Sequence, residues 1–429
     1  MSRGETIYAL SSGHPPAAIA VVRISGQAAA GALTSLAGTL PEPRVASVRQ
    51  LRDPNNGEVL DQALVLFFPG PNSATGEDLA ELHLHGGRAV VAGVLDALAG
   101  VDGLRAAEPG EYTRRAFENG RIDLTEAEGL SDLLMAETQS QRRTSLALAG
   151  GALSRRIADW QARLLRLSAD LEAVLDFSDE GDVEEEIPAT WLDSLEVLAD
   201  EIDARLRSPS AERLRDGIRV VIAGPPNAGK SSLLNWLAGR RAAITSAIAG
   251  TTRDLVEAPT AIGGHPFLLI DTAGLRESDE EIEAEGIQLA RESLDAADLI
   301  LWLGPPSDCP DATRAIRIQS KIDLDPSLQP GAEIGVSSET GAGMDGLVAL
   351  LIERARSLLP QEGEVAINSR HRQALADALA HLQEAGQTQD ALVASEALRL
   401  TRCELDRVTG RAGVEDMLDA LFGNFCIGK

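Results

Sequence analysis

The stretch at residues 224–231 constrains the fold of this chain more than any other. It reads Gly-Pro-Pro-Asn-Ala-Gly-Lys-Ser, which fits the pattern G-x-x-x-x-G-K-[ST] of a loop that wraps phosphate groups. An apolar run at 218–222 precedes the loop, and apolar residues at helical spacing follow it from Leu233. In a strand–loop–helix unit, backbone N–H groups and the helix N-terminus converge on phosphate oxygens. We therefore predict a P-loop nucleotide domain rather than a glycine-rich turn without a ligand, with Lys230 at the β- and γ-phosphates and Ser231 on Mg²⁺.

Length and composition favour several soluble domains in a reducing compartment. The chain has 429 residues, of which 44% are apolar and 24% charged, and no run is long and apolar enough to span a bilayer. The first residues lack the apolar block of a signal peptide. Cys309, Cys403 and Cys426 are too few and too scattered for a disulfide framework. We therefore expect a cytoplasmic protein.

The charge balance argues against a protein that binds nucleic acid with its whole surface. The net charge of −27, from 39 basic and 66 acidic residues, repels polyanions. Binding to nucleic acid would need a local basic patch or a basic partner. Arginine clusters occur, for example at Arg114, Arg115 and Arg121, and we interpret them as solvated helix faces.

The order of apolar patterns predicts a multidomain fold. Strands are expected at 18–24, 63–68 and 80–85, and a long helix carries an apolar seam from Leu153 to Val174. Strands and helices then alternate from Ile218 to about 359, as in a doubly wound parallel sheet. We predict an α+β N-terminal domain, an all-α helical domain and an inserted Ras-like α/β P-loop domain. The predicted boundaries are 1–118, 119–212 for the first helical part, 213–362 for the P-loop domain, and 363–429 for the second helical part.

Four further stretches after the phosphate loop indicate guanine rather than adenine. The run at 250–254 supplies a switch-type threonine for Mg²⁺, and Asp271-Thr272-Ala273-Gly274 supplies a carboxylate for Mg²⁺ and an N–H for the γ-phosphate. Ser320-Lys321-Ile322-Asp323 ends in a carboxylate that can accept both N1–H and N2–H of guanine. Ser337-Ser338-Glu339 is placed to close over the base. Their order on one predicted sheet indicates a GTPase.

Two departures from the Ras-like pattern concern affinity and hydrolysis. Ser320 stands where asparagine is usual, so nucleotide affinity is expected to be lower while Asp323 keeps guanine selectivity. Leu275 stands where Ras-like enzymes place a glutamine that orients water. An acidic run follows, and position alone does not choose among Glu277, Asp279, Glu280, Glu281 and Glu283. No arginine finger is evident, so a monovalent cation on Asn227 is one hypothesis and a loop-bracing Asn227 the other.

Four segments together resemble the MnmE (TrmE) family of tRNA-modification GTPases. They are GPPNAGKSS, IAGTTRD, DTAGLRE and the terminal FCIGK. The resemblance covers the whole chain and includes EYTRRAFENGRIDLTEAE. It implies a dimeric, potassium-activated GTPase with a tetrahydrofolate-binding N-terminal domain. It also implies a flavoprotein partner, MnmG (GidA), in a heterotetramer or larger complex. Together they would add an aminomethyl or carboxymethylaminomethyl group to carbon 5 of the tRNA wobble uridine, with the one-carbon unit from 5-formyl- or methylene-tetrahydrofolate.

The resemblance also implies roles for single residues. K⁺ would be held by Asn227, Ser246, Ile248 and Thr251, and Mg²⁺ by Ser231 and Thr252. Glu283 would organise water, and Lys230 would act with it in catalysis. The folate would meet Arg23, Glu81, Arg121 and Lys429. The implied GTP-binding set is Asn227, Ala228, Gly229, Lys230, Ser231, Ser232, Ser246, Ala247, Ile248, Ala249, Gly250, Thr251, Thr252, Asp271, Thr272, Ala273, Gly274, Ser320, Lys321, Asp323, Ser337 and Ser338.

Three alternatives remain open from the residues alone. Glu81, His83 and His85 share one strand face, which suits either a polar surface or a zinc site in a GTPase-linked hydrolase. Cys426 suits either a packing role or a nucleophile, since no base is identifiable beside it. The rival function is a switch GTPase of the Era type without modification chemistry. That rival predicts a basic RNA-binding appendage after the nucleotide domain, whereas this chain continues as an apolar helical block.

Overall fold

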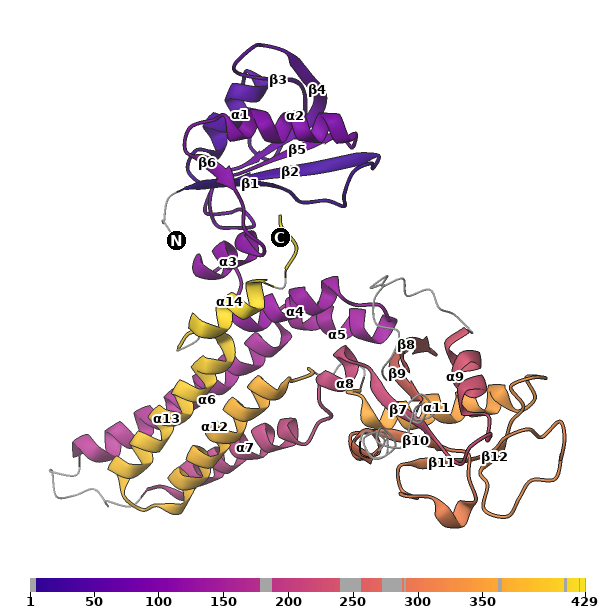
Figure 1. Cartoon of the computed structure of the whole chain (residues 1–429). Helices are drawn as coiled ribbons and strands as arrows, with labels where there is room; N and C mark the ends of the chain where they lie inside the picture. Colours follow the sequence, from indigo (N-terminus) through magenta and orange to yellow (C-terminus); the bar gives the residue numbers. More distant parts are fainter. Residues whose placement is uncertain are drawn as a thin grey trace. The chain divides into compact units, whose positions relative to one another are not determined.

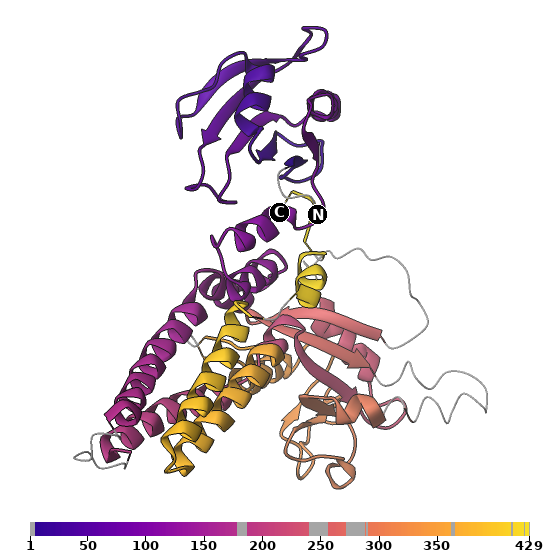
Figure 2. The same cartoon turned by 90° about the vertical axis from the view of Figure 1, so that its left-hand side faces the viewer.

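The computed structural model places the chain in two compact units, one of Met1–Ser131 with Asp406–Lys429 and one of Asp132–Leu405. Figures 1 and 2 show the elements of each unit from two directions. Among the described residues, no helix is long and apolar enough to cross a membrane. The structure describes residues 5–177, 187–239, 256–271, 288, 291–361, 365–412, 415–423 and 425–428.

A six-stranded sheet in the order β3-β4-β5-β2-β1-β6 forms the base of the first unit. Its neighbours pair antiparallel except β1 and β6, which are parallel. Apolar residues from this sheet and from two helices, α1 (Ala29–Ala37) and α2 (Arg88–Ala99), form one core. The predicted strands are confirmed, although β4 begins earlier than expected. The strands are β1 (Thr6–Leu10), β2 (Ile19–Ser25), β3 (Ser47–Arg52), β4 (Val59–Phe68), β5 (Leu79–His85) and β6 (Leu104–Ala106).

The end of the chain completes the first unit. Helix α14 (Glu415–Gly423) contributes Leu418 and Phe422 to an apolar cluster with residues of α3 (Glu111–Glu118) and α4 (Leu124–Leu134). Beyond it, Ile427 forms an antiparallel bridge with Pro109. Gly428 has φ +91°, and a Cβ there would lie 2.2 Å from the Leu10 carbonyl oxygen. The C-terminal residues are therefore packed tightly against β1.

Long helices make up part of the second unit: α5 (Gln139–Ala149), α6 (Ala152–Phe177), α7 (Ala189–Leu206), α12 (Ser369–Gln387) and α13 (Ala391–Thr409), whose residues from Asp406 onward belong to the first unit. The predicted seam of α6 is confirmed from Leu153 to Leu171, where the residues at this spacing are at most 4% exposed, whereas Val174 at its end is only partly buried. The Glu201 carboxylate of α7 accepts from Trp160 Nε1 at 3.0 Å and from Arg163 Nη1 at 2.8 Å. The apolar seam and these polar contacts together fix α6 against α7.

The second sheet, in the order β12-β11-β10-β7-β9-β8, belongs to the nucleotide domain. All neighbours pair parallel except β8, which is antiparallel to β9. The predicted parallel α/β architecture is thus confirmed. Its elements are α8 (Glu212–Arg215), β7 (Ile218–Ala223), α9 (Lys230–Gly239), β8 (Val256–Ile262), β9 (His265–Asp271), β10 (Leu299–Trp302), β11 (Ala315–Gln319), β12 (Ile334–Gly335) and α11 (Met344–Leu358).

The segments that enter and leave the nucleotide domain lie side by side. Ser210 and Ile367 form a parallel bridge, and the Ala211 N–H donates to the Ile367 carbonyl at 3.1 Å. The Glu212 carboxylate also accepts from the Ser369 N–H at the start of α12. Insertion of one domain into another requires such adjacent ends. The joint is therefore built from backbone pairing and one helix-capping carboxylate.

Candidate functional site

The carboxyl ends of the parallel strands bring the predicted nucleotide loops to one edge of the sheet. A pocket of about 210 Å³ lies there, between the loops that follow β7, β11 and β12. Ligands in open α/β sheets bind at this edge. The pocket contains seven of the predicted residues, namely Gly229, Ser232, Ser320, Lys321, Asp323, Ser337 and Ser338.

The phosphate loop is held by lysine contacts to its backbone. Lys230, at the start of α9, is buried, and its ammonium donates to the carbonyls of Gly224 at 3.2 Å and Pro225 at 3.0 Å. Asn227 has φ +63°, a left-handed conformation that asparagine tolerates better than most residues. The Lys321 ammonium donates to the Asn227 carbonyl at 2.8 Å. The loop that follows β11 thus braces the phosphate loop directly.

The Lys321 contact modifies the expectation drawn from Ser320. The asparagine that is usual at that position would brace the phosphate loop, and a serine can do less. Ser320 does line the pocket. It lies close to Gly229 of the phosphate loop, because a Cβ added at Gly229 would be 3.9 Å from the Cβ of Ser320. The bracing contact in the structure comes from the next residue, Lys321. Sequence reasoning assigned Lys321 to the nucleotide site but not to this role.

Ser231 and Asp271 supply adjacent oxygen atoms beside the phosphate loop. The Ser231 hydroxyl donates to the Asp271 carboxylate at 2.6 Å, and Asp271 is 4% exposed at the end of β9. A hydroxyl and a carboxylate are hard oxygen ligands of the kind that Mg²⁺ prefers. The donor chemistry of this pair therefore fits the predicted magnesium ion.

Several predicted residues fall outside the described part of the chain. They include the whole predicted switch run, the water-organising glutamate and the terminal lysine. These residues are Ser246, Ala247, Ile248, Ala249, Gly250, Thr251, Thr252, Thr272, Ala273, Gly274, Glu283 and Lys429.

The first unit contains a second pocket, of about 380 Å³. Arg23 of β2 and Arg121, just after α3, both line it, so the structure brings two predicted folate residues together. The Tyr112 hydroxyl donates to the Arg23 carbonyl at 2.8 Å, and burial raises the pKa of Tyr112. Besides Arg23, Tyr112 and Arg121, the pocket is lined by Ser73, Ala74, Thr75, Leu79, Thr113, Ala116, Ile122 and Leu130. Apart from Arg23 and Arg121, sequence reasoning gave none of these residues a role.

Glu81 lies beside this second pocket without lining it. Its carboxylate accepts from Arg23 Nε at 2.9 Å and contacts His83 Nε2 at 3.2 Å, and its side chain is 15% exposed. His85 Nδ1 instead contacts the Asp61 carboxylate at 2.7 Å. The two histidines thus have different carboxylate partners. Among the described residues, no group of three or more His, Cys, Asp or Glu is arranged to hold a metal.

A buried ion cluster lies next to the second pocket. The Glu111 carboxylate, 5% exposed, accepts from Arg105 Nη2 at 2.6 Å and from Arg115 Nη2 at 2.9 Å. Burial alone would raise the pKa of Glu111, but hydrogen bonds from Arg105, the Glu108 N–H and Arg115 outweigh it and lower the pKa. The interpretation of Arg115 as part of a solvated face was wrong, because its side chain is 12% exposed and paired with two carboxylates.

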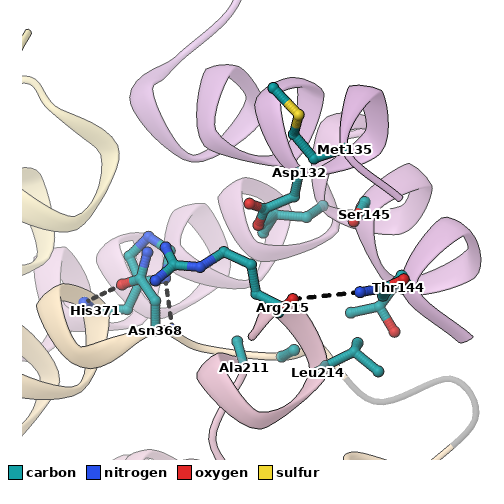
Figure 3. A pocket seen from close by; sticks show the side chains of 12 residues that line it. Asp132, Met135, Thr144, Ser145, Ala211, Leu214, Arg215, Asn368 and His371 are labelled. Atoms are coloured by element: carbon teal, nitrogen blue, oxygen red, sulfur yellow. Dashed lines mark hydrogen bonds between the residues drawn. The ribbon is translucent and has the colours of Figure 1, made fainter. Parts of the chain in front are cut away.

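A third, small pocket lies at the joint of the nucleotide domain. Figure 3 shows Asp132, Arg215, Asn368 and His371 around it, from the end of α4, from α8 and from the start of α12. The Gln141 amide donates to the Arg215 carbonyl at 3.3 Å on the same side. Its volume of about 50 Å³ suits a water molecule rather than a nucleotide or a folate.

Two family models of known proteins together match nearly the whole chain. The family model "GTP-binding protein TrmE N-terminus" matches residues 6–121, and "MnmE helical domain" matches residues 124–426. The chain is also similar to the G domain of the T. maritima FeoB iron transporter, with 25% identity over 32% of this chain and 98% of that one. The TM-score of 0.24 is too low for that likeness to support a conclusion.

Two curated relatives, both named tRNA modification GTPase MnmE, match over their full or nearly full length. The Erythrobacter litoralis protein is 56% identical over 99% of this chain and 100% of its own. The Rhizorhabdus wittichii protein is 56% identical over 100% of this chain and 97% of its own. Full-length identity at this level, together with both family models, shows that the chain belongs to the MnmE family of tRNA modification GTPases.

Proposed function

We propose that this protein hydrolyses GTP to drive modification of the tRNA wobble uridine at carbon 5, with addition of an aminomethyl or carboxymethylaminomethyl group. One observation carries the proposal. The loops after β7, β11 and β12 converge on a single pocket in a chain that matches MnmE relatives along its length. The carboxylate of Asp323 in that pocket suits the two N–H groups of guanine. Lys230 and Ser231 lie at the phosphate end.

Mg²⁺ and K⁺ are the proposed metal cofactors. Ser231 and Asp271, whose oxygens lie 2.6 Å apart, fit Mg²⁺, with Thr252 as a further ligand. Mg²⁺ would neutralise charge on the β- and γ-phosphates, and K⁺ would place positive charge at the bridge between them. Asn227 is the described member of the K⁺ set, which also includes Ser246, Ile248 and Thr251. The protein's own residues hold the phosphates by the loop backbone and by Lys230.

Glu283 is the proposed residue that positions the attacking water. Leu275 has no hydrogen-bonding group at the position where Ras-like enzymes carry a glutamine. Steady-state hydrolysis of GTP with and without potassium tests the role. Glu283→Ala should abolish most potassium-stimulated turnover while GTP still binds. Unchanged stimulation would remove the assignment.

The N-terminal pocket is proposed to bind 5-formyl- or methylene-tetrahydrofolate. Arg23 and Arg121 line it, and Arg121 would meet the anionic glutamate tail, with Lys429 as a further cation. Glu81 is held by Arg23 at 2.9 Å and would accept from pterin N–H groups. Titration calorimetry with 5-formyl-tetrahydrofolate on the whole protein tests this, and no binding would refute it.

The proposed assembly is a homodimer that joins MnmG in a heterotetramer or larger complex in the cytoplasm. The net charge of −27 supports a division of labour, because a partner that presents the tRNA surface would offset the repulsion. Mass spectrometry of wobble uridines from cells that lack this protein tests the function as a whole. Unmodified carbon 5 supports the proposal, whereas normal uridines with a ribosome-assembly defect would favour the Era-type switch.

A further inference from the structure

We propose that the ion pair between Arg115 and Glu77 is a positioning pair that fixes the distance between the two walls of the N-terminal pocket. The inference rests on the proposed function, in which this pocket takes a reduced folate. It adds that retention of the ligand depends on two residues that do not line the pocket.

The two walls come from different parts of the first unit. One wall is the loop between β4 and β5, which contributes Ser73, Ala74 and Thr75. The other is helix α3, which contributes Tyr112, Thr113 and Ala116. A loop and a helix can separate unless side chains or backbone groups connect them. The width of the pocket therefore depends on the contacts between these two walls.

Arg115 connects the helix to the loop. Its Nη1 lies 3.0 Å from the Glu77 carboxylate, which also accepts from the Ser25 hydroxyl at 2.9 Å. The Ser25 hydroxyl in turn lies 2.7 Å from the hydroxyl of Thr75, which is 2% exposed and lines the pocket. A continuous set of polar contacts thus runs from α3 to the loop wall.

Arg115 is itself held in place from the side away from the loop. Its Nη2 donates to the Glu111 carboxylate at 2.9 Å and to the Glu5 carbonyl at 3.0 Å. Glu111 is further bound by Arg105 at 2.6 Å. A guanidinium that bridges two carboxylates and is mostly buried has little freedom to move. In any other position it would lose these hydrogen bonds without gaining contact with water. Arg115 therefore acts as a rigid spacer between α3 and Glu77.

A second contact limits the size of the effect. The Asn119 amide, just after α3, donates to the Thr75 carbonyl at 2.7 Å. Loss of the ion pair should therefore loosen the loop wall without releasing it. We expect faster dissociation of the ligand and a smaller change in its association, because the open pocket remains accessible.

The test uses the full-length protein, the variants Glu77→Gln and Arg115→Lys, and the control Arg114→Gln. Arg114 neighbours Arg115 on the same helix but pairs with Glu118 and Asp419. Stopped-flow and calorimetric binding of 5-formyl-tetrahydrofolate should show about tenfold weaker affinity for Glu77→Gln, mostly in the dissociation rate. Arg115→Lys keeps the charge but cannot span both carboxylates, so it should show a loss of similar size. Arg114→Gln and the basal GTP hydrolysis of every variant should stay unchanged.

The outcomes separate this inference from the function on which it rests. Wild-type protein that does not bind 5-formyl-tetrahydrofolate refutes the folate proposal and this inference together. Wild-type binding with an unchanged dissociation rate in Glu77→Gln refutes only the positioning role. Glu77 has a 29% exposed side chain, so its variant should fold even if Arg115→Lys does not. A loss of affinity shared equally by Arg114→Gln would also contradict the proposal, since it would indicate a general effect on α3.

Discussion

The nucleotide pocket and the N-terminal pocket of this protein are held together in different ways. In the nucleotide pocket, Lys230 and Lys321 donate to backbone carbonyls of the phosphate loop. Beside the N-terminal pocket, a network of charged side chains adds to such contacts, with Glu111 between Arg105 and Arg115. A loop held through its backbone carbonyls depends on the two lysines that donate to them rather than on the side chains of the loop itself. A pocket braced by buried charges depends on each member of its network.

The largest expected effect breaks the nucleotide pocket and leaves the other intact. Lys230→Ala removes the cation at the phosphate end, so kcat/KM for GTP should fall by about 10³-fold. Hydrolysis assays and nucleotide-binding measurements check this. Affinity for 5-formyl-tetrahydrofolate in the same sample serves as the control and should not change. Normal GTP binding in this variant would contradict the phosphate-loop assignment.

The converse experiment weakens the charged network. Glu111→Gln leaves Arg105 and Arg115 without their shared carboxylate, so the first unit should lose about 3 kcal/mol of stability. All four tryptophans lie in the second unit. Their fluorescence should therefore show that the second unit unfolds in the variant as it does in the wild type. Hydrogen exchange of amides in β1 and β2 should report the loss. Equal destabilisation of both units would show that the network is not local.

Base recognition gives the next effect. Asp323→Asn replaces one acceptor with a donor, so the N2–H of guanine is no longer accepted and affinity for GTP should fall about 10²-fold. Xanthosine triphosphate carries an oxygen at that position, so the variant should bind it better than the wild type does. Competition between the two nucleotides measures the switch. A variant with undiminished GTP preference would place guanine recognition elsewhere.

The brace between the two nucleotide loops should matter less. Lys321→Met keeps the length and apolar stem of the side chain but removes the donor to the Asn227 carbonyl, so GTP affinity should fall about tenfold. Direct titration with GTP measures the loss. Lys321→Arg is the matched variant and should retain most of the affinity. If Lys321→Met binds GTP normally, the brace does not contribute.

The smallest effect concerns pH. The pKa of Glu111 is lowered in the folded protein from the ordinary value of 4.5, so the unfolded chain takes up a proton more readily. The stability that Glu111 provides is therefore complete at neutral pH. It is lost as the pH falls below about 4.5 toward the folded pKa. Amide exchange in the first unit across this range should show the loss, with a shallower dependence in Glu111→Gln. An identical dependence in both proteins would contradict the assignment.

The sequence was most informative where spacing decides structure. The apolar seam of α6 and the strands β7 and β9 follow from periodicity, and the nucleotide loops follow because parallel strands end at one edge. The ion cluster was not predictable in this way. Glu111 and Arg115 are one helical turn apart, a spacing that most often marks a solvated pair. Only the fold brings Arg105 and Glu77 to them and buries the group.

The first unit also has a consequence for how the protein is made. Ile427 pairs with Pro109, and Gly428 packs against the Leu10 carbonyl, so late-synthesised residues complete a structure begun by the earliest ones. Contacts between residues so distant in sequence form slowly. During most of translation, the C-terminal partner of each contact has not yet been made. The nucleotide domain can therefore fold before residues 427 and 428 are made, whereas the first unit is completed only once they are.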